Sequence, residues 1–134
     1  MIQDTRIRYL NDQPHRDAIY VLYWMQEAQR PRNNAALKMA IDEADRYKLP
    51  VVVCDRSYMP SQIGGRMSLA DKTDCRVIQV ETETVIPVEV TTEKLEYGVR
   101  TIRPKLHRVW DEYLVALKED DPKIDATTLK TEMC

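Results

Sequence analysis

An uninterrupted run of apolar and β-branched residues, Ile19–Met25, constrains the fold of this chain more than any other feature. Such a run predicts a strand buried on both faces, which is typical of a parallel sheet. A second run, Val51–Cys54, follows a segment with helical periodicity that ends near Lys48 and is stopped by Pro50. The apolar positions of that segment are Leu37, Ala40, Ile41, Ala44 and Tyr47. The strand–helix–strand order predicts an α/β fold with a right-handed connection.

The segments around this unit predict more of the same sheet. Arg76–Val80 is expected to be a third parallel strand, and Thr84–Val90 is expected to be extended, with Pro87 at an edge or in a loop. The polar arm Tyr9–Asp17 is expected to be irregular. A helix over Ser61–Lys72 is less favoured, because the two glycines inside it each cost about 1 kcal/mol.

The last third of the chain has a near-heptad apolar stripe made of Leu95, Val99, Ile102, Leu106, Val109, Tyr113 and Leu117. Pro104 removes one helical N–H, so we expect two helices that meet near Arg103. Residues 1–118 are then one small two- or three-layer Rossmann-like α/β domain, with a short parallel sheet of about three strands and C-terminal helices. Residues 119–134 are expected to form a polar, frayed tail.

Composition excludes several classes of function. The chain of 134 residues has the size of a single domain. Its net charge of -2 shows no overall excess of positive charge, so DNA contact by this chain alone is not expected. Its apolar runs are too short for a bilayer, and its start lacks the apolar region of a signal peptide, so we expect a cytoplasmic protein without membrane contact. Three cysteines without a CxxC pair, and two distant histidines, predict neither a disulfide framework nor a metal site.

Loops that follow parallel strands at their carboxyl ends are the default ligand site of an open α/β sheet. The first loop offers Gln26, Gln29, Arg30 and Asn33 just before a helix, which suits an anionic or amide-bearing ligand. Asn33 is expected to cap that helix. The alternative is that Asn33 only caps and Arg30 is only solvated.

The second loop begins with Asp55 and Arg56, which bind a ligand or simply form ion pairs with neighbours. Neither a GxGxxG nor a GxxxxGK[ST] motif is present, so a conventional dinucleotide or nucleoside triphosphate site is excluded. No residue stands out as catalytic.

The segment from Lys94 to Arg108 carries several cations against the single acid Glu96. These cations are Lys94, Arg100, Arg103, Lys105 and Arg108. They form either a phosphate-contacting face or a solvated face opposite the apolar stripe. Acidic flanks over Glu81–Glu93 weaken the interpretation as a DNA contact.

The segment Tyr20–Leu37 closely follows the pattern YVLYWMQxxQRxxDNxAL and resembles the opening of class II DNA photolyases. Cys54–Tyr58 resembles a later strand end of that family, and Val85–Leu106 resembles the segment that closes its N-terminal domain. The chain departs from the family where Asn33 replaces the usual Asp. It also lacks roughly 60 residues, about two βα units, after Val53.

In photolyases the helical C-terminal domain holds the flavin, contacts the DNA lesion and transfers the electron, whereas the N-terminal domain helps to hold an antenna chromophore. The resemblance therefore implies descent from DNA photorepair but no lyase activity in this chain alone. It implies a non-catalytic chromophore- or nucleotide-binding or interaction module, with a deazaflavin or another antenna chromophore as its cofactor. The planar ligand would lie near Trp24, which offers a stacking face or is simply part of the core, beside the loop residues named above.

Two alternatives remain for the function. The chain is either the N-terminal part of a split deoxyribodipyrimidine photolyase, with FAD held only by a partner flavin domain, or a degenerate remnant. Because loss of neighbouring strands exposes a sheet edge, we also expect a homodimer, which a monomer mass at high dilution would overturn.

Overall fold

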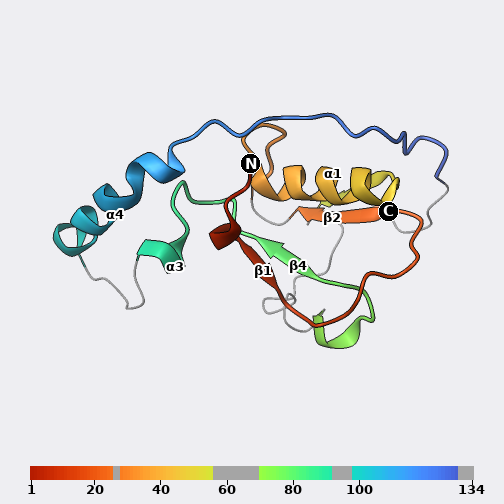
Figure 1. The fold of residues 1–134 in the computed structure, drawn as a ribbon, viewed down its shortest axis with the longest axis horizontal. Coiled ribbons are helices and arrows are strands. Elements are labelled where there is room, and N and C mark those ends of the chain that lie inside the picture. Colours follow the sequence, from red (N-terminus) through yellow and green to blue (C-terminus); the bar gives the residue numbers. More distant parts are fainter. Residues whose placement is uncertain (26–27, 56–69, 92–97, 130–134) are drawn as a thin grey trace.

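The computed structural model describes residues 1–25, 28–55, 70–91 and 98–129 (Figure 1). The elements in chain order are η1 (Asp4–Arg6), β1 (Ile7–Tyr9), β2 (Val21–Met25), α1 (Ala35–Tyr47), β3 (Val51–Asp55), β4 (Ile78–Val80), α3 (Val88–Thr91) and α4 (Val99–Tyr113). Residues 70–72 are also helical. Within these ranges no helix is long and apolar enough to cross a membrane.

The predicted strand–helix–strand unit is present. β2 and β3 pair in parallel from Val21 opposite Val51 to Met25 opposite Asp55, and α1 packs against both strands (Figure 1). Ala40, Ile41 and Ala44 of the apolar stripe on α1 are buried in this unit, Ala44 fully, together with Tyr23 of β2 and Cys54 of β3. The helix ends at Lys48, as expected from the sequence, and Lys48 takes the left-handed conformation (φ 56°).

The third strand joins a different sheet from the expected one. β4 pairs antiparallel with β1, from Ile7 opposite Val80 to Tyr9 opposite Ile78 (Figure 1). The expectation of three parallel strands in one sheet is therefore wrong for the described residues, which form two sheets of two strands each. The chain is a small mixed α/β protein. Of the arm Tyr9–Asp17, which was expected to be irregular, only Tyr9 belongs to a strand, because the β4 backbone offers β1 a hydrogen-bonding edge.

The strands of the parallel pair are less buried than their apolar sequences predict. Leu22 and Val53 are 40% and 47% exposed. Side chains alternate between the two faces of a strand, so these two residues lie on opposite faces of the sheet. A parallel pair with one helix packed on it cannot cover both of its faces.

Two further expectations fail in the last third of the chain. Part of Thr84–Val90 is helical, since α3 begins directly after the fully buried Pro87 and Thr91 N donates to Pro87 O (3.3 Å). Pro104 does not separate two helices but lies inside α4. The helix tolerates the lost hydrogen bond because its C-terminal end is fastened to the body, where Tyr113 is 4% exposed and its hydroxyl shares a 2.7 Å hydrogen bond with Thr5.

The polar segment after α4 is not frayed over its first part. It leaves the end of α4 and runs back along α1 (Figure 1). We call residues 118–123 the strap, because their side chains and backbone hold this segment to α1.

Candidate functional site

The loop between β2 and α1 is organised around one buried amide. Asn34 is 3% exposed, and its Nδ2 donates to Tyr23 Oη (2.9 Å), Ala28 O (3.0 Å) and Arg30 O (2.9 Å). Its Oδ1 accepts from Leu37 N (3.0 Å) and so caps α1. The helix cap is therefore Asn34 and not the expected Asn33. The loop has a fixed shape because a single side chain satisfies donors and acceptors on both sides of it.

Arg30 and Asn33, proposed from the sequence as ligand contacts, are used within the chain. The Arg30 guanidinium donates to Thr82 O (2.6 Å) and to Asn33 O (3.2 and 3.3 Å). Asn33 takes a left-handed conformation (φ 49°), and its N–H donates to Glu119 Oε1 (3.0 Å). Thr82 Oγ1 accepts from Ala35 N (3.1 Å). Donors that the sequence offered to an anionic ligand are thus satisfied by the protein itself.

The structure describes only some of the remaining candidate residues. Gln26 and Arg56 are outside the described residues, Gln29 is exposed, and Asp55 is the last residue of β3, opposite Met25. Trp24 precedes the last residue of β2 and is level with Cys54, which is 8% exposed. The structure therefore brings Trp24 and Asp55 to one end of the sheet.

Trp24 has the unsatisfied polar atom of this region. Its indole Nε1 is buried and has no hydrogen-bond partner among the residues that the structure describes. Tyr23 faces the cap of α1, so the neighbouring Trp24 side chain lies on the other face of the sheet. A buried N–H without an acceptor costs about 1–3 kcal/mol, which a bound group with a carbonyl or ring nitrogen would recover.

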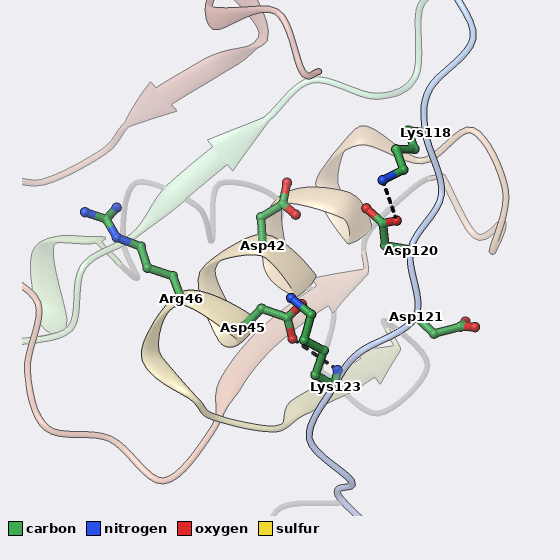
Figure 2. Close-up of a pocket in the computed structure, with 7 residues that line it drawn as sticks. All are labelled: Asp42, Asp45, Arg46, Lys118, Asp120, Asp121 and Lys123. Atoms are coloured by element: carbon green, nitrogen blue, oxygen red, sulfur yellow. Dashed lines mark hydrogen bonds and ion pairs between the residues drawn. The ribbon is translucent and has the colours of Figure 1, made fainter.

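A hollow of about 560 Å³ lies between α1 and the strap (Figure 2). Its lining is Asp42, Asp45, Arg46, Lys118, Asp120, Asp121 and Lys123. Arg46 and Asp121 point away from it in Figure 2, and among the described residues no three side chains are grouped to hold a metal ion.

Ion pairs across this hollow fasten the strap to α1. Asp45 accepts from Lys123 N (3.1 Å) and Nζ (3.0 Å), whereas Asp120 lies 3.2 Å from Lys38 Nζ and 3.4 Å from Lys118 Nζ. The strap is therefore held to α1 by ion pairs, which largely compensate the charges around the hollow. Lys38, whose side chain is only 12% exposed, is not among the residues that line the hollow, but it pairs with both Asp42 and Asp120 and so links α1 to the strap.

These contacts shift the pKa values of the groups that make them. Hydrogen bonds from Lys123 lower the pKa of Asp45, and the hydrogen bond from Lys38, followed by that from Lys118, lowers the pKa of Asp120. Burial pushes the pKa of Lys38 down, but its bonds to Asp42 and Asp120 outweigh burial and raise it.

We expect acid to release the strap. A carboxylate with a lowered pKa in the folded protein stabilises it above the ordinary pKa of about 3.8 and loses that contribution as the pH falls. An NMR titration should give midpoints below 3.8 for Asp45 and Asp120. Lys38→Met should move the Asp120 midpoint up, and Lys118→Met should move it less, because Lys38 is the larger cause. An unchanged Asp120 midpoint in Lys38→Met would contradict the fastening.

Reasoning from the sequence missed the residues that build the loop. Asn34 is adjacent to Asn33, the residue that was predicted to cap the helix, and either asparagine of this pair was a candidate for the cap. Thr82 and Glu119 had no local signal, because they meet the loop from positions 47 and 86 residues away.

Two known proteins similar to this chain are both named deoxyribodipyrimidine photo-lyase. No family model matches the chain. It is 25% identical over 190 residues to the deoxyribodipyrimidine photo-lyase of Methanothermobacter thermautotrophicus, a match that covers 97% of this chain and 43% of that protein. It is 44% identical over 43 residues to the deoxyribodipyrimidine photo-lyase of Oryza sativa subsp. japonica, covering 32% of this chain and 8% of that protein.

The chain thus spans less than half the length of each relative. The archaeal match is 190 residues long and exceeds the 134 residues of the chain by 56, so the relative has residues inside the match that lack a counterpart here. The similarity is weak in identity but extends over nearly the whole chain, and it suggests a protein related to the deoxyribodipyrimidine photo-lyases.

Proposed function

We propose that this chain is a non-catalytic binding module of the photolyase lineage, a shortened form of the N-terminal antenna domain of class II photolyases. Its ligand is a planar chromophore or nucleotide-like molecule, with a deazaflavin as the first candidate. The observation that carries this proposal is the buried, unpartnered indole N–H of Trp24 near the carboxyl end of β2.

The position of Trp24 fits a ligand site on physical grounds. Ligands of open α/β sheets bind beyond the carboxyl ends of the strands, where Trp24 and Asp55 lie. An indole offers both an N–H donor and a flat apolar face, which together suit a conjugated ring with a carbonyl or ring nitrogen. The adjacent loop is held in shape by Asn34, so one wall of the site is set before a ligand binds.

The contacts of the loop change the roles of the other candidate residues. Arg30 and Asn33 are positioning residues, because their polar groups bind Thr82 and Glu119. Gln29 and Asp55 remain candidates for ligand contacts, as do Gln26 and Arg56, which lie outside the described residues.

A second candidate function is the N-terminal part of a split photolyase that works with a separately encoded flavin domain. The exposed Leu22 and Val53 favour it, since a partner would cover apolar sheet surface that the described residues leave open. The match to 43% of the archaeal relative fits this alternative as well. A homodimer through the same sheet is the other partner arrangement that we propose.

Absorption spectra of the purified protein, alone and after incubation with a deazaflavin or with FAD, test the proposal. We expect retention of a chromophore band, and Trp24→Phe should weaken binding about fivefold, because it removes one hydrogen bond but keeps an aromatic ring. Trp110→Phe, a matched change on the exposed α4, should leave the affinity unchanged.

Three outcomes would contradict the proposed module. One is a spectrum with protein absorption only after both incubations. Another is binding that Trp24→Phe leaves unaltered. The third is FAD retention that requires an added flavin domain, which would establish the split photolyase instead.

A further inference from the structure

One side of α4 presents an exposed ridge of cations and aromatic rings. We call Arg100, Arg103, His107 and Trp110 the α4 ridge; spacings of three, four and three residues place them along one side of the helix. All four are exposed, and Trp110 keeps 44% of its surface in solvent. The buried Tyr113 lies on another side of the helix, so the ridge does not take part in fastening α4 to the body.

The cations of the ridge lack acidic partners. No ion pair in the described part of the chain involves Arg100, Arg103 or the neighbouring Arg108, although other cations, such as Lys38 and Lys123, are paired. The like charges of Arg100 and Arg103, three residues apart, repel each other by a few tenths of a kcal/mol. An anionic partner would remove this repulsion.

The aromatic end of the ridge offers flat surfaces. The rings of His107 and Trp110 are 5.8 Å apart between centroids and inclined by 33°. Exposed aromatic rings beside arginines are the combination on which proteins stack the bases of single strands, while the arginines contact the phosphates. Duplex DNA hides its base faces, so a ridge of this kind favours a single strand.

We propose that the α4 ridge binds single-stranded nucleic acid, with the phosphates on the arginines and a base stacked on Trp110. From Arg100 to Trp110 the helix rises about 15 Å, enough for about four stacked nucleotides. This surface goes beyond the proposed ligand site and is separate from it, since α4 lies apart from the β2–α1–β3 unit (Figure 1). The proposal revises the expectation, drawn from the net charge of -2, that this chain alone does not contact DNA, because phosphates respond to the local charge of the ridge and not to the net charge of the chain. The photolyase resemblance places DNA contact in a different domain and does not supply this surface.

Fluorescence of the Trp24→Phe protein isolates Trp110 and tests the proposal with a twelve-nucleotide single-stranded DNA. We expect quenching on titration, and an affinity that falls with salt at a logarithmic slope of about -1.4, for the two arginine–phosphate contacts of Arg100 and Arg103. Arg100→Glu with Arg103→Glu should lower the affinity at least about tenfold and flatten the slope. Arg32→Glu, the same type of substitution at a single arginine in the loop before α1, should alter both less than about twofold.

Anisotropy of a labelled strand measures variants that lack Trp110. Trp110→Ala should bind about tenfold more weakly, and RNA of the same sequence should bind the unaltered protein within about threefold, because neither contact uses the sugar. The proposal is overturned by absence of quenching at low salt, by equal losses in Arg32→Glu and the double variant, or by tighter binding of the duplex. Equal quenching by inorganic polyphosphate would also overturn it, because polyphosphate has no bases to stack.

Discussion

Asn34→Ala should lower the free energy of unfolding by about 3 kcal/mol, a large share of the 5–15 kcal/mol typical of a domain. Loss of a helix cap costs about 1 kcal/mol. The change also removes the donor that Ala28 O and Arg30 O share, and each buried acceptor left unsatisfied adds about 1 kcal/mol or more. Urea unfolding followed by circular dichroism should show a lower midpoint with an unchanged slope.

Asn33→Gly is the matched control for this prediction. Asn33 is the neighbouring residue with the same amide, but it is exposed and takes a left-handed conformation that glycine adopts readily. We expect its free energy of unfolding to stay within about 0.5 kcal/mol of the unaltered protein. Equal effects of the two substitutions would show that Asn34 does not organise the loop.

Local sequence signals predicted the β2–α1–β3 unit because they belong to single elements. The apolar runs that form β2 and β3 have no helical periodicity, and the stripe on α1 has a clear one. The end of α1 at Lys48 followed from Pro50 two residues later. Each of these signals acts within a few residues, so no knowledge of distant contacts was needed.

The pairing of β4 depends on residues far away in the chain. Ile78–Val80 has two β-branched apolar residues around Gln79 and was predictable as a strand, yet its partner is Ile7–Tyr9, a strand of three residues that shows too few alternations to predict. The strand was therefore predictable from the sequence, but the sheet that it joins was not. In the same way, Pro104 predicted a break, and only the anchoring of Tyr113 by Thr5 explains why α4 continues through it.

The parallel pairing of β2 and β3 was predictable from the sequence, and it brings the carboxyl ends of the two strands together as expected. The role of Arg30 was not predictable, since an arginine before a helix is equally suited to an anion and to backbone carbonyls. The carbonyl that Arg30 binds, Thr82 O, belongs to a residue 52 positions later in the chain, so no local sequence signal indicated this role.

Arg6 joins three parts of the molecule and gives the second large prediction. Its guanidinium donates to Glu81 O (3.3 Å), Thr84 O (3.0 Å) and Val85 O, and its Cζ lies 5.5 Å from the Tyr113 ring centre. Burial lowers the pKa of Arg6, and the charges of Glu81 and Tyr113 oppose that shift. The N-terminal segment, the connection from β4 to α3 and the end of α4 therefore meet at one cation.

Arg6→Leu should lower the free energy of unfolding by about 2–3 kcal/mol, since carbonyls lose their charged donor and Tyr113 loses its cation–π contact. It should also loosen α4, which an NMR measurement of Tyr113 ring and amide signals would detect. Arg8→Leu is the matched control: it removes an arginine two residues away whose pair with Glu89 is exposed, and should cost less than about 1 kcal/mol. If Arg6→Leu is no more destabilising than Arg8→Leu, Arg6 does not join these segments, and α4 is held by Tyr113 and Thr5 alone.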